Sequence, residues 1–211
     1  MNDGVIVLGA GGHGRVVADT LRAAGETVRG LVDRDASRAG EAINGFTILG
    51  TDDVLVDFDP ATTSLANGIG SIGSTAARRN IFDRMKADGW SFAAVVHPAA
   101  WVSPDASVGE GVQVLAGAVV QIGAHIGANS ILNTRASVDH DCQIGDHSHI
   151  APGATLSGGV QIGSGTHIGT AAAIIQGVHL GDNCLVAAGA VVTRDFPSGS
   201  QLFGVPARPR A

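Results

Sequence analysis

The sequence predicts a protein of two parts, an α/β unit built on a parallel sheet and a second region in which short strands coil around a narrow aliphatic core. Three observations support this prediction. The first hundred residues alternate apolar runs with helical patterns, the remainder repeats an aliphatic residue at every sixth position, and the charge density falls between the two parts. Residues 101–211 hold only 4 of the 13 Lys and Arg and 7 of the 19 Asp and Glu. We expect one domain over residues 1–100 and a second over residues 101–211.

The composition excludes several classes of protein. Of 211 residues, 45% are hydrophobic, which supports a sizeable core, and 31 are glycine, about twice the usual share, which indicates many tight turns. The net charge is −6 and Lys86 is the single lysine, so a nucleic-acid binder is excluded. The N-terminus lacks a basic segment and no apolar run reaches about 18 residues, so we expect a cytoplasmic protein with neither a signal peptide nor a membrane span.

The elements of the α/β unit follow from its apolar runs. A first strand over Val5–Leu8 leads through a glycine-rich turn into a helix over Arg15–Ala24, and a second strand over Val28–Val32 ends before Asp33. After an acidic, irregular stretch, the pattern predicts a strand over Thr63–Ile69, a helix over Thr75–Ala87 and a fourth strand over Phe92–Val96. Such a unit is Rossmann-like, but it is too short to contain both halves of a dinucleotide-binding domain.

The turn after the first strand carries a phosphate-binding pattern. Gly9-Ala10-Gly11-Gly12-His13-Gly14 fits G-x-G-x-x-G, in which glycines let backbone N–H groups approach a pyrophosphate at a helix N-terminus. Asp33 lies 19 residues beyond Gly14, where an acid can bind a ribose hydroxyl. The motif alone leaves three interpretations open, namely dinucleotide binding, a nucleotide-linked substrate and a purely structural turn.

The second region repeats with a period of six residues. The aliphatic positions are Val102, Val108, Val114, Val120, Ile126, Leu132, Val138, Ile144, Ile150, Leu156, Ile162, Ile168, Ile174, Leu180, Val186 and Val192. This period fits neither an α-helix nor a hairpin meander, but it fits short strands joined by tight turns with the aliphatic side chains inside. Cys142 and Cys184 each lie four residues after an aliphatic residue, so we expect buried small side chains there and no nucleophile.

The histidines of the repeat differ in what they can do. His140 lies between Asp139 and Asp141 in the turn region of its hexad, so an imidazole near pKa 6.5 has carboxylates to orient it and can act as a general base. The alternative is a surface histidine that merely sits among acids. His149 and His167 are 18 residues apart and should stack on one face of adjacent coils, but two imidazoles without a third ligand do not make a metal site, so we expect no metal.

The string from Ile131 to Val160, together with the glycine loop, resembles the bacterial hexapeptide-repeat sugar acyltransferases of the sialic acid O-acetyltransferase and nucleotide-amino-sugar N-acetyltransferase family. The resemblance implies a left-handed parallel β-helix with three hexads in each coil, a homotrimer, and acetyl-CoA as cosubstrate. It implies N-acetylation of a GDP- or UDP-linked amino sugar, such as a 4-amino-4,6-dideoxy sugar, for lipopolysaccharide or another surface glycan. A sialic acid O-acetyltransferase and a non-catalytic nucleotide-binding protein are the alternatives.

The resemblance also implies roles for single residues. His140 would be the general base and Asp141 its orienting acid. Acetyl-CoA would be contacted by His149, Gly158, Thr170, Ala188 and Pro206. The nucleotide-linked substrate would be contacted by Gly11, Gly12, His13, Gly14, Asp33 and Asp35, with Asn133 near the sugar.

Overall fold

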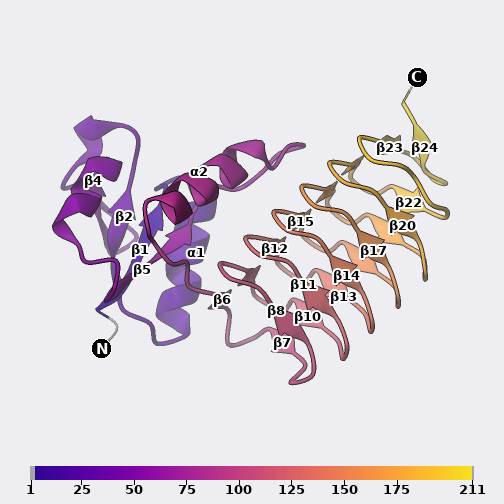
Figure 1. The fold of residues 1–211 in the computed structure, drawn as a ribbon, viewed down its shortest axis with the longest axis horizontal. Coiled ribbons are helices and arrows are strands. Elements are labelled where there is room, and N and C mark those ends of the chain that lie inside the picture. The colour runs from indigo at the N-terminus through magenta and orange to yellow at the C-terminus, as the bar shows by residue number, and fades with distance from the viewer. Residues whose placement is uncertain (1–2, 211) are drawn as a thin grey trace.

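The computed structural model describes residues 3–210. Its N-terminal part is an α/β unit (Figure 1). The elements are β1 (Gly4–Leu8), α1 (Gly12–Ala23), β2 (Val28–Val32), the 3₁₀ turn η1 (Ala36–Arg38), β3 (Ala42–Ile43), β4 (Phe46–Gly50), the 3₁₀ turn η2 (Asp52–Asp57), β5 (Thr63–Asn67) and α2 (Ala76–Ala87). The strands lie in the order β3-β4-β2-β1-β5, and every pair is parallel except the hairpin of β3 and β4.

The sheet of this unit is covered on both sides, which explains the uninterrupted apolar sequence of β1. Val5 and Val7 face a cluster that includes Val17 and Leu21 of α1. Ile6 and Leu8 point to the other side of the sheet, into a cluster to which α2 contributes Phe82 and Met85. Alternate residues of one strand therefore hold one helix on each side of the sheet.

The second part is a parallel β-helix with three faces, which we name after their strands. The β7 sheet contains β7 (Trp101–Val102), β10 (Val119–Val120), β13 (Ser137–Val138), β16 (Thr155–Leu156), β19 (Ala173–Ile174) and β22 (Val191–Val192). The β8 sheet contains β8 (Ser107–Val108), β11 (His125–Ile126), β14 (Gln143–Ile144), β17 (Gln161–Ile162) and β20 (His179–Leu180). The β9 sheet contains β6 (Val95–Val96), β9 (Gln113–Val114), β12 (Ile131–Leu132), β15 (His149–Ile150), β18 (His167–Ile168), β21 (Leu185–Val186), β23 (Gln201–Phe203) and β24 (Arg208–Pro209).

Tight turns at the corners explain the glycine content. The third residue after fourteen of the sixteen inward aliphatics has a left-handed backbone, with φ between 53° and 72°. These positions are Gly111, Gly117, Gly123, Asn129, Arg135, Asp141, His147, Gly153, Gly159, Gly165, Ala171, Gly177, Asn183 and Gly189. Because a side chain strains this conformation, glycine and the short polar residues Asn and Asp are favoured there.

The core of the β-helix confirms the period of six. Fourteen of the sixteen predicted aliphatic residues are buried, and Val102 and Val108, in the first coil, are partly buried. At the other end, Phe196 and Leu202 join the same core. Partners in adjacent coils are 18 residues apart, as in the pairing of Val120 with Val138, so each coil contains three hexads.

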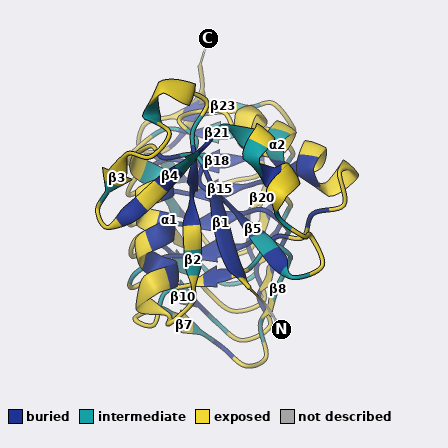
Figure 2. Cartoon of the chain, turned by 90° about the vertical axis from the view of Figure 1, so that its left-hand side faces the viewer, coloured by how far each residue is buried: buried dark blue, intermediate teal, exposed yellow. Residues whose placement is uncertain are grey.

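The N-terminal part covers the β9 sheet. From β9 to β18 the outward-facing residues of that sheet are buried, namely Gln113, Ile131, His149 and His167. The matching residues of the β8 sheet are exposed, namely His125, Gln143, Gln161 and His179. Figure 2 views the molecule from the side of the N-terminal sheet, with the buried strand β1 and the partly buried strand β2 in front of the β-helix. One face of the β-helix is therefore an internal interface, and the other two remain free in the single chain.

Several predicted boundaries need correction. The prediction of a fourth strand over Phe92–Val96 in the N-terminal sheet is wrong: Phe92 forms a single bridge to Leu65, whereas β6 pairs with β9 of the β-helix. The stretch described as irregular contains β3, β4 and two 3₁₀ turns. The helix α1 begins at Gly12, three residues earlier than predicted. Its first turn, Gly12-His13-Gly14, contains no apolar residue and two poor helix formers, so the sequence pattern did not indicate it. Within residues 3–210, neither helix has the length and apolar character that a membrane span requires.

Candidate active site

His140 and Asp141 lie at an exposed corner, in the turn that joins β13 to β14. The His140 Nδ1 and the Asp141 Oδ2 are 2.9 Å apart, and the Asp139 Oδ1 accepts a hydrogen bond from the His140 backbone N–H. Asp141 occupies the left-handed position of the turn, with φ of 61°. Because a carboxylate faces Nδ1, that nitrogen carries the proton, and Nε2 keeps its lone pair. The arrangement is that of a general base with its orienting acid.

The acids around His140 also raise its pKa above the ordinary 6.5. The hydrogen bond to Asp141 is the largest cause, desolvation opposes it, and the charges of Asp139 and Asp141 add to the increase. The imidazole is 57% exposed, so Nε2 can reach a substrate. Two glycines leave room for the pair. A methyl group on Gly158, one coil further on, would collide with the His140 ring, and one on Gly123, one coil before, would meet the Asp141 carboxylate.

The two cysteines are buried in the β-helix core, as predicted. Burial raises the pKa of the Cys142 thiol, which lowers the fraction of reactive thiolate. Its Sγ lies 3.2 Å from the backbone carbonyl oxygen of Ser157, inside the coil, whereas the His140 side chain faces outward. The proximity of Cys142 in the sequence therefore does not give a cysteine–histidine pair.

Asn133 and His149 lie together at the edge of the covered β9 sheet. The Asn133 Nδ2 donates a hydrogen bond to the His149 Nε2 at 3.0 Å. His149 and His167 stack in adjacent coils as predicted, with ring centres 4.9 Å apart. Burial first, and then His167, lower the pKa of His149 to about 3, so the ring is neutral. Among the described residues, no group of three or more His, Cys, Asp or Glu side chains gathers in a way that could hold a metal ion.

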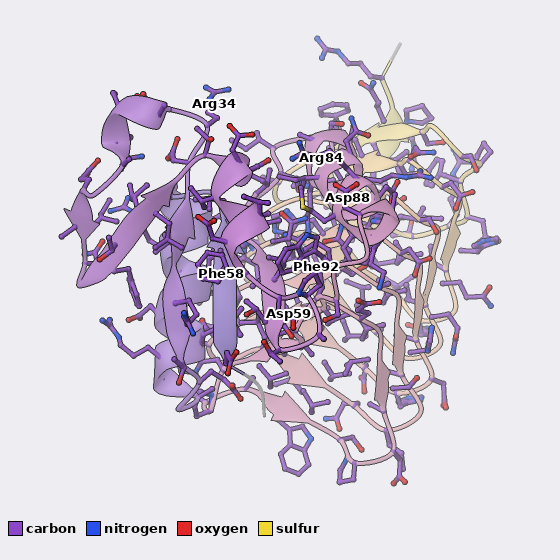
Figure 3. All side chains as sticks on the ribbon, turned by 60° about the vertical axis from the view of Figure 1, so that its left-hand side comes forward. Arg34, Phe58, Asp59, Arg84, Asp88 and Phe92 are labelled. Atoms are coloured by element: carbon purple, nitrogen blue, oxygen red, sulfur yellow. The ribbon has the colours of Figure 1, made fainter. Side chains whose placement is uncertain are left out.

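The glycine loop opens onto a cavity of about 540 Å³. Gly9, Ala10 and Gly11 line it from the loop, and Asp33 and Arg34 line it from the end of β2. Arg34 extends outward from that end (Figure 3). Gly11 precedes α1 without a side-chain cap, so the first N–H groups of the helix are available to an anion. A Cβ on Gly11 or Gly12 would meet no atom within 4 Å, so the fold itself does not require glycine at either position.

Gly14 and His13 have structural partners. A methyl group on Gly14 would collide with the backbone of Gly9, so only glycine lets α1 start this close to β1. The His13 Nε2 lies 2.8 Å from the Gln113 Oε1 and ties the loop to the β-helix. Burial, with a smaller effect of Arg78, lowers the pKa of His13 to about 4, so it can offer a hydrogen bond but no positive charge.

The two predicted acids differ in position. The Asp33 Oδ2 accepts a hydrogen bond from the Arg38 guanidinium at 2.6 Å, and Asp33 still lines the cavity. Asp35 instead caps η1, where its carboxylate accepts from the backbone N–H and the hydroxyl of Ser37. The structure therefore brings Asp33 to the cavity and directs Asp35 to its own turn.

The remaining predicted acetyl-CoA contacts lie along the corner between the β9 and β7 sheets. Thr170 and Ala188 are exposed and one coil apart, in the same column of the turn as Thr134, which follows Asn133. The Gly189 N–H donates to the Thr170 carbonyl oxygen at 2.8 Å, which holds the two coils together. Pro206 is exposed beyond β23, at the far end of the β-helix.

Sequence reasoning missed the residues that join the two parts. Ser71, in the loop after β5, places its Oγ 2.6 Å from the His149 Nδ1. Arg78 of α2 is fully buried and donates to the carbonyl oxygens of Asn67, Ile69 and Asn129. Burial lowers its pKa to about 9, and its second terminal nitrogen has no hydrogen-bond partner within residues 3–210. These contacts depend on which face of the β-helix the N-terminal part covers, and no local pattern indicates that face.

The predicted residues do not form one site within a single chain. His140 lies at the corner between the β7 and β8 sheets, whereas Asn133 lies at the corner between the β9 and β7 sheets. Strand β13 separates the two corners. Since the β-helix has three faces, the His140 corner is the one opposite the covered β9 sheet, and therefore the one furthest from the glycine loop.

Comparisons with known proteins agree with this architecture. The family model described as PglD N-terminal domain matches residues 4–85. Two hexapeptide models follow, the bacterial transferase hexapeptide (six repeats) over residues 123–158 and the hexapeptide repeat of succinyl-transferase over residues 159–194. No curated protein sequence matches the chain.

Solved structures match over nearly the whole chain. A histidine-to-asparagine mutant of perosamine N-acetyltransferase from Caulobacter crescentus, in complex with CoA and GDP-perosamine, is 38% identical with a TM-score of 0.91, covering 99% of this chain and 97% of that one. The acetyltransferase domain of PglB from Neisseria gonorrhoeae, in complex with acetyl coenzyme A, is 39% identical with a TM-score of 0.91 and full coverage of both chains. WeeI from Acinetobacter baumannii is 26% identical with a TM-score of 0.86, covering 98% and 99%. The chain therefore belongs to the CoA-dependent hexapeptide-repeat sugar acetyltransferases that carry a PglD-type N-terminal domain.

Proposed function

We propose that the chain is an acetyl-CoA-dependent N-acetyltransferase that acts on the amino group of a nucleotide-linked sugar. The observation that carries this proposal is the His140–Asp141 pair, with Nδ1 held by a carboxylate and Nε2 free at an exposed corner. The relatives support the substrate class, because one of them was crystallised with CoA and GDP-perosamine. An amine acceptor is favoured over a hydroxyl because that relative is an N-acetyltransferase.

The chemistry assigned to His140 is proton transfer without a covalent enzyme intermediate. The His140 Nε2 takes a proton from the sugar amine while the amine nitrogen bonds to the acetyl carbon. The carbon–sulfur bond of the acetyl-CoA thioester breaks. The resulting imidazolium is stabilised by Asp141 and returns the proton to the departing thiolate. Cys142 takes no part, because its thiol is buried in the core. The product is an amide on the sugar and free CoA.

The N-terminal part is proposed to hold the nucleotide. The cavity beside Gly9–Gly11 combines the uncapped N-terminus of α1 with the guanidinium of Arg34, and both attract phosphate. Asp33 at the same cavity can accept a hydroxyl or an N–H group of the nucleoside. Acetyl-CoA is assigned to the corner that carries Thr170 and Ala188, with Pro206 as a further contact. This corner is exposed and continuous over several coils, as an extended ligand requires. Gly158, the other predicted contact, lies at the His140 corner instead.

A homotrimer is proposed as the active form. In one chain the β7 sheet separates His140 from Asn133, so an approach of two chains is needed to bring a base and an acceptor together. The outward residues of the β7 sheet suit subunit contact because they carry no charge, namely Trp101, Val119, Ser137, Thr155, Ala173 and Val191. We assign the enzyme to the cytoplasm, which agrees with its free thiols, and to the synthesis of a bacterial surface glycan such as lipopolysaccharide.

The test is a screen of CoA release with GDP- and UDP-linked amino sugars, with sialic acid as the hydroxyl acceptor. We expect release with an amino-sugar nucleotide and none with sialic acid. A thermal-shift series with NAD, GDP-sugars and UDP-sugars separates the nucleotide-binding interpretations, since a ligand at 100 times its Kd stabilises by about 2.7 kcal/mol. Stabilisation by NAD alone, without CoA release from any substrate, would contradict the proposal.

A further inference from the structure

A chain of hydrogen bonds crosses from the N-terminal loop to the edge of the β-helix. The Ser71 Oγ lies 2.6 Å from the His149 Nδ1, and the His149 Nε2 lies 3.0 Å from the Asn133 Nδ2. The same Ser71 hydroxyl lies 3.3 Å from the His167 Nδ1. Four side chains from four segments of the sequence are thus connected at one buried interface.

The direction of each hydrogen bond follows from Asn133. Its Oδ1 accepts the backbone N–H of Thr134 at 2.8 Å, which turns the amide NH₂ group toward His149. An NH₂ group can only donate, so the His149 Nε2 must be the acceptor and the proton must lie on Nδ1. That Nδ1–H donates to the Ser71 Oγ, and the Ser71 hydroxyl proton is left for His167. The neutral state of His149 agrees with this pattern, because burial and the nearby His167 lower its pKa to about 3.

The loop that carries Ser71 is itself held in place. Arg78 donates to the carbonyl oxygens of Asn67 at 2.8 Å and Ile69 at 3.0 Å, both within four residues of Ser71. The Gln113 Nε2 of the β-helix donates to the same Asn67 carbonyl at 2.7 Å. Ser71 therefore meets His149 from a fixed loop.

His149 has little access to a ligand of its own. It is 5% exposed, and both ring nitrogens have partners within the protein. Asn133 is only half-buried, and its Nδ2 has a second N–H that no described residue accepts. Of the two, Asn133 is the residue placed to donate to a substrate.

We infer that His149 is a positioning residue that acts through Asn133: Ser71 holds His149 in the tautomer with the proton on Nδ1, and the His149 Nε2 holds the Asn133 amide so that its second N–H points at the acceptor sugar. This role rests on the proposed function. It differs from a direct contact between His149 and the thioester of acetyl-CoA, because the occupied Nε2 has no proton to donate to a carbonyl oxygen.

The tautomer can be tested without any substrate. In the full-length protein labelled with ¹⁵N-histidine, the His149 signal is assigned by its loss in a His149→Gln variant. We expect a protonated Nδ1 and an unprotonated Nε2 throughout the neutral pH range. A protonated Nε2 would overturn the inference. If no substrate releases CoA, the proposed function fails, while this measurement still decides the tautomer.

Kinetics then test whether His149 acts through Asn133. We expect His149→Phe to lower kcat about tenfold, Asn133→Ala to lower it at least as much, and the double variant to match Asn133→Ala within about twofold, since residues that act as one unit are not additive. The KM for acetyl-CoA should stay unchanged. His149→Gln should restore more than half of the rate, because its Oε1 can accept from Asn133. If the losses of kcat in the two single variants multiply in the double variant, or if the KM for acetyl-CoA rises, His149 acts on the thioester and the inference is overturned.

The β-helix supplies a matched control. His125 on the exposed β8 sheet makes the same kind of contact, with its Nδ1 2.7 Å from the Ser107 Oγ, one coil before it. Within residues 3–210 it has no asparagine partner like Asn133, and it lies on a face that the N-terminal part does not cover. We expect His125→Phe to leave kcat and both KM values unchanged, and an equal loss in both variants would contradict a specific role for His149.

Discussion

At the scale of single residues, the proposed chemistry depends on the free Nε2 of His140. Replacing His140 with Asn removes the proton acceptor, and because the side chain is exposed the fold should not change. We expect kcat to fall by about 10²- to 10⁴-fold, the usual contribution of a general base, with little change in the binding of acetyl-CoA. Steady-state kinetics and thermal shift with CoA check both statements. A variant that keeps more than half of the wild-type rate would show that His140 is not the base.

Asp141 sets the pH range in which His140 can act. Because acids raise the pKa of His140 above 6.5, the ring is protonated and inactive at lower pH, and the rate should rise with pH through a value above 6.5. Asp141→Asn removes the largest cause of the raised pKa, so the acidic limb of the kcat profile should move to lower pH while the maximal rate falls. Titration of the substrate amine affects both proteins equally, so only the difference between them is interpreted. If the acidic limb of the profile stays at the same pH in the variant, Asp141 does not set the pKa of the catalytic base.

Among the contacts of the site, those between sequence neighbours could be predicted and those between distant residues could not. The His140–Asp141 pair was predictable because its members are neighbours in a repeat whose outward positions are known. The pairing of Ser71 with His149 spans 78 residues and of His13 with Gln113 spans 100, so neither leaves a local pattern. Asp35 was predicted as a ligand from the family resemblance, whereas its carboxylate accepts hydrogen bonds from Ser37 in its own turn.

At the scale of elements, the position of the His140 ring depends on the turn of the next coil, which carries Gly158. A methyl group on Gly158 would collide with the imidazole, so Gly158→Ala should displace His140 rather than the backbone. We expect kcat to fall about 10- to 100-fold from this misplacement, with an unchanged melting temperature. In a His140→Ala background the same substitution should have no further effect, because there is no ring to displace. An additional loss in that background would mean that Gly158 acts on the ligand directly.

The glycine loop contains one glycine that the fold requires and one that it does not. A Cβ at Gly11 meets nothing within 4 Å, whereas one at Gly14 collides with Gly9. Gly11→Val should therefore fold normally and raise the KM for the sugar nucleotide tenfold or more, roughly the loss of one charged hydrogen bond, while the KM for acetyl-CoA stays constant. Gly14→Ala should cost about 1–3 kcal/mol of stability from overpacking. Thermal denaturation and initial rates measure both, and a stable Gly11→Val enzyme with unchanged KM would remove the loop from the substrate site.

Element prediction succeeded where a strict period existed. The strands of the β-helix follow from aliphatic residues at every sixth position, since each hexad repeats the same short strand and turn. β3 and β4 were missed because they are short, two and five residues, and lie between acidic segments that hide so brief a pattern. The misplaced strand at Val95–Val96 illustrates a different limit, because an apolar pair does not indicate which of two sheets it will join.

At the scale of the whole molecule, the sequence could predict two folded parts but not how they meet. Gln113, His149 and His167 look like surface residues of a repeat, and they are buried because the N-terminal part covers the β9 sheet. The same placement leaves His140 at the opposite corner. The residues of one chain therefore do not make up the proposed site. In the proposed oligomer, His140 faces one neighbouring chain, and Asn133 faces another.

Mixed oligomers test this division directly. Chains carrying His140→Ala and chains carrying Asn133→Ala are each expected to be impaired, and they can be coexpressed with two different tags and purified as mixed assemblies. In a cyclic trimer of randomly mixed chains, about one quarter of the sites combine an intact His140 from one chain with an intact Asn133 from its neighbour. Activity should therefore return to about a quarter of the wild-type value, well above either parent. If each site lay within one chain, no mixture could exceed its parents, and recovery would be absent even though the mixed assemblies form.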